Sequence, residues 1–235
     1  MKKREFLTLG SASVLGAMVS PVLAKSDDDE AKRQLKAQYV KAWKEVLKKY
    51  REDASINFVL AVRYLEDSEA EVTLYEKFPK EGNAWSVRFT CEAYVGREGI
   101  GKTREGDMKS PEGDFAVTAG FGIRANPGAK IPYIQVTPTV YACDEEGPYY
   151  NQIIDTKKVQ HTCKGEAMYR YTPEYNYGLV IDYNKENRYP AGSAIFVHVM
   201  GVNTFTAGCV ALPEARVREL LTLAHRGMRV VIAHA

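Results

Sequence analysis

The chain has 235 residues, of which 45% are hydrophobic and 26% charged, and its 32 Lys and Arg nearly balance its 30 Asp and Glu. This composition is typical of a globular protein and excludes a disordered, collagenous or coiled-coil chain. The near balance of charge gives no electrostatic reason to expect nucleic acid as a partner. No apolar stretch after residue 24 is long enough to cross a bilayer.

The first 24 residues have the pattern of an export signal. A basic start at 1–4 precedes an apolar segment, 6–19, and a small-residue cleavage pattern at 22–24. Residues 3–7 also approximate a twin-arginine signal, with Lys in place of the first Arg. We expect cleavage of this signal peptide and export to the periplasm or cell envelope; the alternative is an uncleaved membrane anchor. The mature chain would hold 29 basic and 29 acidic residues, so bulk charge would not choose its partner.

The next part of the chain predicts one helix and then a meander of strands. Apolar residues recur every three or four positions over 31–50, which is typical of an amphipathic helix. The period changes to two over 57–64, 71–78 and 84–95, which predicts antiparallel strands separated by polar turns.

The remaining sequence adds further strands and a second helix. The stretch 96–128 is rich in Gly and interrupted, and the later strands are predicted at 131–137, 177–182, 194–200 and 229–233. A helix is predicted at 213–225, with Pro213 in its first turn and Gly227 after its end. Together these elements predict an α+β fold that is mainly β and carries a helical N-terminal arm.

The candidate catalytic residues lie on the predicted strand 194–200 and in the loop that follows it. His198 lies on that strand, and a loop then leads to Thr206, Gly208 and Cys209 ahead of the second helix. A thiol is a useful nucleophile only as thiolate, so a neighbouring imidazole should lower its pKa. Gly208 allows close approach of a substrate, and the amides of Gly208 and Cys209 could form an oxyanion hole, with the Thr206 hydroxyl beside them. The alternative is a buried structural Cys near a core His.

Two other chemical interpretations have less support. A zinc site would need close-pair ligand spacing, which is missing among His161, Cys163, His225 and His234. Lys102 follows a Gly as in a phosphate-binding loop, but the rest of that pattern is absent. We therefore expect neither a metal nor a cofactor.

The motif formed by His198 and Thr206-x-Gly208-Cys209 resembles the signature of the L,D-transpeptidase catalytic domain, the YkuD-like fold. Two further blocks are similar to the same family, namely Lys102-x-x-x-Gly106-Asp107-x-x-Ser110-Pro111-x-Gly113-x-Phe115 and Asn184 followed by Gly192-Ser193-Ala194-Ile195-Phe196-Val197-His198. The resemblance covers about 94–233, and its short spacer between His and Cys matches one branch of the family. It suggests a catalytic domain at 94–235, with a helix and strands at 25–93 packed on it.

The resemblance implies a β-sandwich-like domain that acts on peptidoglycan stem peptides. Cys209 would attack the carbonyl of the third residue, form a thioester and release D-Ala, with His198 as base and Thr206 lining the site. The Gly208 and Cys209 amides would bind the oxyanion. An amine would then complete transpeptidation, in a protein expected to be a monomer. The alternatives are an L,D-carboxypeptidase or amide hydrolase on the same scaffold, and a non-catalytic wall-binding module.

The sequence departs from the family at the positions next to the nucleophile. Many members have Arg two residues after the Cys, where this chain has Ala211, and His before the Gly, where it has Ala207. A clamp for a substrate carboxylate must therefore come from elsewhere. The weak candidates for substrate binding are Arg170, Tyr169 and Arg104. The aromatic run 171–177 is interpreted either as a lid or as an exposed loop packed by its own rings.

Four cysteines in an oxidising compartment leave three besides the nucleophile. Cys143 and Cys163 lie in a loop-rich stretch, and we predict a disulfide between them. Cys91 alternates with apolar residues and is expected to pack as a small core residue. The alternative is that all three are reduced and buried.

Overall fold

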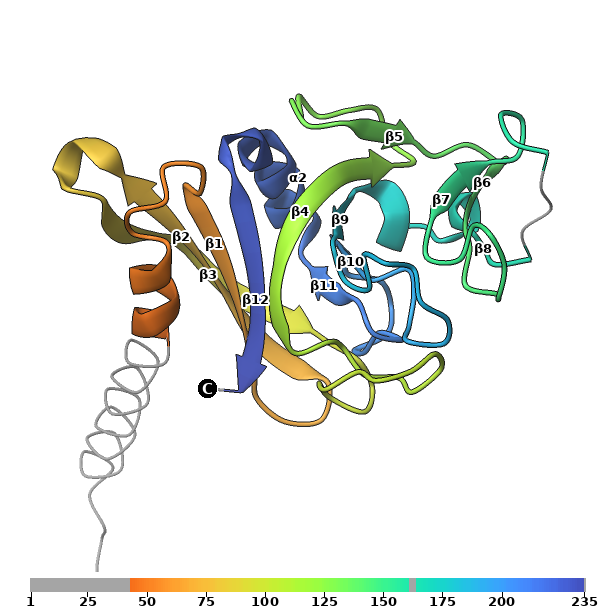
Figure 1. Cartoon of the computed structure of the whole chain (residues 1–235), viewed down its shortest axis with the longest axis horizontal. Coiled ribbons are helices and arrows are strands. Elements are labelled where there is room, and N and C mark those ends of the chain that lie inside the picture. Colours follow the sequence, from red (N-terminus) through yellow and green to blue (C-terminus); the bar gives the residue numbers. More distant parts are fainter. Residues whose placement is uncertain (1–42, 161–163, 235) are drawn as a thin grey trace, which may run out of the picture. The chain divides into compact units, whose positions relative to one another are not determined.

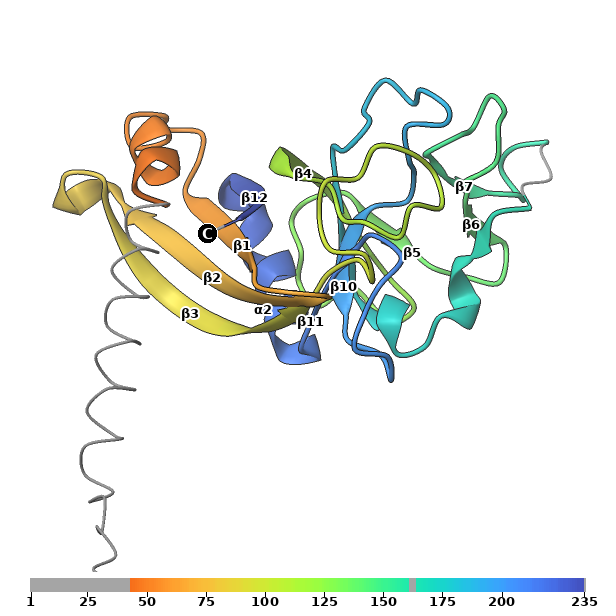
Figure 2. The ribbon, with the colours of Figure 1, turned by 90° about the horizontal axis from the view of Figure 1, so that it is seen from below.

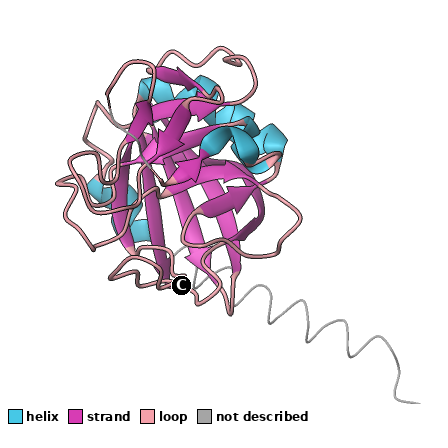
Figure 3. Ribbon diagram, turned by 90° about the vertical axis from the view of Figure 1, so that its right-hand side faces the viewer, coloured by secondary structure: helices cyan, strands magenta, loops and turns pink. Residues whose placement is uncertain are grey.

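The computed structural model describes residues 43–160 and 164–234. Strands are the main regular structure of the described fold, with short helices around them (Figure 3). The expected class, α+β and mainly β, is confirmed. The predicted helix over 31–50 is helical at 43–49, and its earlier part lies outside the described residues, as does the expected signal peptide.

One large sheet organises the molecule (Figure 1). Its strands are β1 (Phe58–Tyr64), β2 (Glu69–Phe78), β3 (Ala84–Tyr94), β4 (Gly113–Gly122), β5 (Tyr133–Gln135), β9 (Gly178–Ile181), β10 (Phe196–Val199), β11 (Val210–Leu212) and β12 (Met228–His234). They follow the order β12-β1-β2-β3-β11-β10-β9-β4-β5, and β12 also pairs with β4. That second pairing closes eight of the strands into a ring, which leaves β5 on its outside.

A smaller sheet and short helices complete the described fold. The smaller sheet contains β6 (Val140–Ala142), β7 (Ile153–Asp155) and β8 (Glu166–Ala167), and the helix near the C-terminus is α2 (Glu214–Leu223). Single 3-10 turns are η1 (Pro79–Glu81), η2 (Met168–Arg170), η3 (Glu174–Asn176) and η4 (Ala224–Arg226). No helix within the described ranges is both long and apolar enough to span a bilayer.

The three strands that open the described chain form the expected antiparallel meander (Figure 2). In β2 the alternation is clear, because Val72 and Leu74 are fully buried while the adjacent Glu71 and Thr73 are partly exposed. The division of the chain at residue 94 stays a prediction. In the structure, strands from both sides of that position share the large sheet.

The sequence did not predict β4, which runs through the Gly-rich stretch. Two of its glycines are fixed by close packing. A Cβ on Gly120 would lie 2.5 Å from Leu221, and one on Gly122 would lie 2.1 Å from the Tyr133 hydroxyl. Residues of low strand propensity are therefore retained because side chains from β5 and α2 occupy the space above them.

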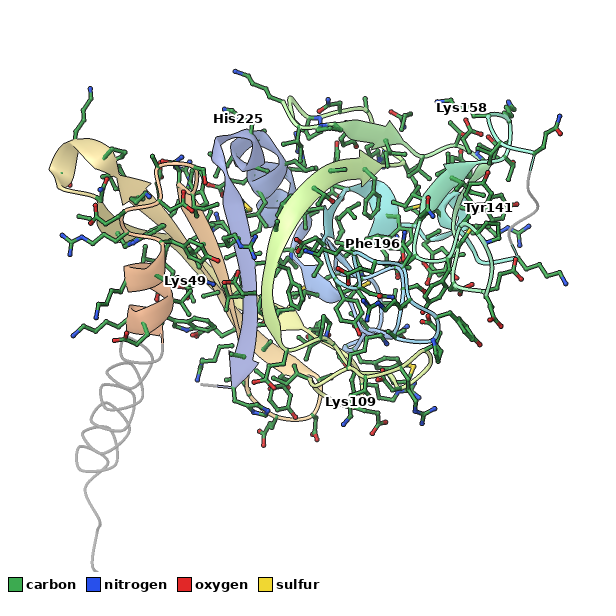
Figure 4. The ribbon with its side chains drawn as sticks, in the orientation of Figure 1. Lys49, Lys109, Tyr141, Lys158, Phe196 and His225 are labelled. Carbon is green, nitrogen blue, oxygen red and sulfur yellow. The ribbon has the colours of Figure 1, made fainter. Side chains whose placement is uncertain are left out.

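Helix α2 packs an apolar stripe against the sheet. Val217, Leu220 and Leu221 are fully buried in the main core cluster with residues of β1, β2 and β12. His225, labelled in Figure 4, follows the helix, is exposed and contacts the Thr222 carbonyl, as expected for a capping or solvated residue.

The cysteines divide into bonded and free groups. Cys143 is disulfide-bonded, whereas Cys91 and Cys209 are free thiols. Cys163, the predicted partner of Cys143, lies outside the described residues. Cys91 is partly buried against the main core, and burial raises the pKa of its thiol to about 11.

A buried lysine anchors the segment that enters β1, and its loss is our first prediction. Lys77 is 1% exposed, and its Nζ donates to the carbonyls of Tyr50 at 2.9 Å, Asp53 at 2.5 Å and Arg51 at 3.4 Å. Lys77→Met leaves these carbonyls without their donor, so we expect the free energy of unfolding to fall by about 3 kcal/mol. Urea unfolding measures it, with exposed Lys80→Met as the control. A loss no larger than that of the control would contradict the anchoring role.

Candidate active site

Parallel pairing of β10 with β11 brings His198 and Cys209 together. His198 pairs with Ala211, and Cys209 immediately precedes Val210, the partner of Val197. His198 is 6% exposed and Cys209 is 8% exposed, and both line one cavity of about 240 Å³. The two residues chosen from the sequence as nucleophile and base therefore border the same space.

The turn that carries Cys209 is closed by two hydroxyls. Thr206 Oγ1 donates to the Cys209 carbonyl at 2.7 Å and accepts from the Gly208 N–H at 3.0 Å. Ser110 Oγ donates to the same carbonyl at 3.0 Å. The Gly208 N–H expected to bind an oxyanion is thus already hydrogen-bonded, and Thr206 shapes the turn. Ser110 belongs to the second sequence block, yet nothing in the sequence indicated that it contacts the nucleophile.

Gly208 is required by the shape of this turn. Its φ of +151° lies in a region that other residues rarely adopt, and a Cβ there would approach the Lys109 carbonyl to 2.8 Å. The predicted role of Gly208 in permitting close approach has this steric basis: the neighbouring backbone already occupies the position of a side chain.

The environment of the Cys209 thiol favours its protonated form. Burial, and then the charge of Glu166, raise its pKa to about 12, while the Phe196 N–H and Lys102 act in the opposite direction. The Phe196 N–H donates to Sγ at 3.3 Å, and Sγ donates to the Ala194 carbonyl at 3.2 Å. Among the described residues no hydrogen bond joins His198 to Cys209. His198 is not among the groups that set the pKa of the thiol here, so the expected effect of the imidazole on the thiol stays a prediction.

His198 is held as a neutral imidazole with one nitrogen available. Nδ1 lies 2.8 Å from the Val199 carbonyl, and because a carbonyl only accepts, Nδ1 carries the proton. Nε2 is then a hydrogen-bond acceptor. Burial lowers the pKa of His198, and the edge of Tyr175 packs against the ring at a centroid distance of 5.6 Å. A buried neutral imidazole with a free Nε2 suits a general base.

A second cavity, also of about 240 Å³, meets the first one at the nucleophile. The residues that line both cavities are Met108, Glu166, Ala207 and Cys209. Ala194 and Gly208 line only the second cavity, whereas His198 and Ala211 line only the first. Cys209 can therefore be reached from two sides.

Carboxylates outnumber cations around these cavities. Glu166 and Glu174 line the first, and Glu105, Asp144 and Glu166 line the second. Burial raises the pKa of Glu166, which accepts a 2.5 Å hydrogen bond from the Tyr175 hydroxyl. The sequence analysis did not predict these acidic residues, because they come from separate parts of the chain: Glu105 and Asp144 from loops, Glu166 from β8 and Glu174 from η3.

Lys102 supplies the positive charge that lines the second cavity. Its side chain is 2% exposed, and Nζ pairs with Asp107 at 2.9 Å. Burial alone would raise the pKa of Asp107, but the Lys102 ammonium and three backbone N–H groups lower it to about 2. The sequence indicated no role for Lys102, whereas in the structure it lies beside the turn that carries Cys209.

The three weak substrate-binding candidates do not meet Cys209. Arg104 is exposed, and its backbone N–H donates to Asp107. Tyr169 is 48% exposed, Arg170 is exposed in η2, and none of the three lines either cavity. Tyr175, from the run interpreted as a lid or loop, is instead buried and lines the first cavity.

Within 43–160 and 164–234, no group of three or more His, Cys, Asp or Glu side chains is arranged to hold a metal ion. His161 and Cys163, two residues of the zinc alternative, lie outside those ranges. His234 is exposed, and its ring packs edge-on against Tyr64 at 5.2 Å.

Our second prediction concerns the charge of Glu166. Glu166→Gln removes a carboxylate that opposes thiolate formation at Cys209, so we expect a lower thiol pKa and alkylation of Cys209 about tenfold faster at mildly alkaline pH. Iodoacetamide labelling, followed by peptide mass spectrometry, measures the rate. Glu146→Gln, which removes an exposed carboxylate, is the control. Equal rates in both variants would show that Glu166 does not act on the thiol.

Comparison with known proteins adds a family assignment. The family model YkuD, L,D-transpeptidase catalytic domain, matches residues 68–232. The match therefore includes β2 and β3, which the sequence motifs did not reach. No curated protein matches the chain significantly.

The solved structures that the chain matches include the helical cell shape determining protein Pgp2 from Campylobacter jejuni. Its K307A mutant is 17% identical, with a TM-score of 0.40 and coverage of 80% of this chain and 53% of that one. A second Pgp2 structure is 16% identical, with a TM-score of 0.39 and coverage of 81% and 55%. The present chain thus spans about half the length of these structures.

Proposed function

Because the chain belongs to the YkuD family of L,D-transpeptidase catalytic domains, we propose that it is a cell-envelope enzyme that transfers peptidoglycan stem peptides through a thioester on Cys209. The observation that carries the proposal is the pairing of a buried thiol with a neutral imidazole at one cavity. A wall-binding module without catalysis would have no use for this pair.

The first half of the proposed reaction forms the acyl-enzyme. A substrate carbonyl enters beside Sγ, and the thiol proton moves to Nε2 of His198 as the sulfur attacks the carbonyl carbon. The Cys209 N–H binds the oxyanion of the tetrahedral intermediate. The C–N bond then breaks, the imidazolium returns its proton to the leaving D-Ala amine, and a thioester remains on Cys209.

The second half decides between transfer and hydrolysis. The amine of a second stem peptide, or water, gives a proton to His198 and attacks the thioester, and the thiol leaves with that proton. The two cavities that meet at Cys209 support transfer, because each offers space for one of the two peptides, donor and acceptor. An L,D-carboxypeptidase or amide hydrolase remains the alternative on the same residues.

The proposed setting of this reaction is the periplasm or cell envelope. The signal pattern of residues 1–24 supports export, and the bonded Cys143 suits an oxidising compartment. We propose that the protein acts as a monomer without a cofactor.

Incubation of the purified protein with disaccharide-tetrapeptide, read by mass spectrometry, tests the function. A cross-linked dimer that lacks one D-Ala would support the transpeptidase. A tripeptide product would support the carboxypeptidase instead. An unchanged tetrapeptide, with the protein folded, would contradict both and favour a binding module or a different bond.

A further inference from the structure

Three consecutive backbone N–H groups ahead of β10 donate to three distant side chains. The Gly192 N–H donates to the Tyr150 hydroxyl at 2.9 Å, the Ser193 N–H to Glu105 at 3.3 Å, and the Ala194 N–H to Asn151 Oδ1 at 3.1 Å. The segment 192–194 belongs to a sequence block whose role the reaction above does not explain. Phe196, the first residue of β10, follows this segment and lies inside the fold (Figure 4).

Ala194 is the residue whose carbonyl accepts the Cys209 thiol, and its backbone is strained. Its φ is +53°, a left-handed conformation that a residue with a Cβ rarely adopts. Such a conformation persists where surrounding contacts impose it, and it is found most often at functional sites. The hydrogen bond from the Ala194 N–H to Asn151 is one of the contacts that hold this conformation.

Asn151 is fixed from several sides. Its Nδ2 donates to the carbonyls of Tyr183 at 3.1 Å and Asn184 at 2.9 Å, and its backbone N–H donates to the carbonyl of the disulfide-bonded Cys143 at 2.8 Å. Oδ1 consequently has one orientation, toward Ala194. Asn151 lines a separate cavity of about 190 Å³, which Ala194 also lines, and it lines neither cavity at Cys209.

We propose that Asn151 positions the nucleophile, because its hold on the Ala194 N–H keeps the Ala194 carbonyl on the Cys209 thiol. The inference rests on the proposed function only in taking Cys209 as the nucleophile. A bond from S–H to a carbonyl favours the protonated thiol and fixes the direction of Sγ. The charged and titratable groups near Sγ are Glu166, Lys102, Tyr175 and His198, and a substitution at 151 leaves all of them in place.

Asn151→Gly tests this role, because a φ of +59° at position 151 is free for Gly. We expect alkylation of Cys209 to become about fivefold faster near pH 8.5, since the thiol loses its acceptor. We expect kcat with the tetrapeptide to fall about tenfold with KM unchanged, since Sγ loses its direction. Gln152→Ala is the control, because the side-chain hydrogen bond of Gln152 goes to the Pro148 carbonyl and not to the Ala194 N–H.

Ala194→Gly provides a second test that relieves backbone strain and therefore keeps the fold. If Asn151 acts through this residue, the two substitutions together should have little more effect than either alone. Additive effects, or an alkylation profile of Asn151→Gly equal to that of Gln152→Ala, would overturn the proposal. A wild-type protein without turnover would contradict the proposed function, while the alkylation rates would still decide the role of Asn151.

Discussion

Replacing Cys209 with Ala is expected to lower kcat at least about a thousandfold, because no other group in the cavity can carry the acyl intermediate. The fold should survive, since the thiol behaves as a small apolar side chain and its removal costs little packing. Turnover of the tetrapeptide, measured beside thermal unfolding, separates the two effects.

Cys91→Ala is the matched control for this experiment. Cys91 is the second free thiol of the described chain, and it lies on β3 against the main core. The Cys91→Ala variant should lose some stability and keep its activity. Residual activity of the Cys209 variant above about a thousandth of wild type would exclude covalent catalysis through this residue.

His198→Gln should lower kcat/KM by about a hundredfold to ten-thousandfold, the range of a lost general base. The protonated thiol makes this dependence strong, because its pKa of about 12 leaves little thiolate at neutral pH without a base. His225→Gln is the control, since that ring also contacts a backbone carbonyl but is exposed in η4, after the C-terminal end of α2.

The dependence of kcat/KM on pH is a second test of His198 as the general base. A base must be neutral to act, and burial lowers the pKa of His198 from its ordinary 6.5. Wild-type kcat/KM should therefore persist below pH 6.5 and fall only at the lower, shifted pKa. The variant should lose this acid limb. An identical limb in the variant would assign it to another group.

Cys209 and His198, the predicted nucleophile and base, could be placed at one site from the sequence because both follow from local pattern. A His on a strand of apolar and β-branched residues, and a Cys after Thr-x-Gly, are recognisable without knowledge of tertiary contacts. Their meeting depends only on parallel pairing of β10 with β11. The meander β1–β3 was likewise predictable, because the apolar pattern is a property of each strand alone, although β1 is buried at six consecutive positions instead of alternating.

The rest of the site depends on contacts that no local pattern encodes. Ser110 lies 99 positions before Cys209, and Asn151 lies 43 positions before Ala194, yet each is hydrogen-bonded there. The high pKa of the thiol arises from burial and from Glu166, which becomes a neighbour only on folding. Gly-rich β4 was missed for the same reason, since the side chains that require its glycines come from other elements.

The central claim is that Cys209 carries the acyl group, and the mass of the intact protein during turnover tests it most directly. Protein mixed with disaccharide-tetrapeptide and quenched in acid should gain the mass of the disaccharide-tripeptide acyl group. Hydroxylamine should remove this mass, as expected for a thioester, and peptide mapping should place it on Cys209. Product formation without any such adduct, or an adduct that persists in Cys209→Ala, would contradict the account.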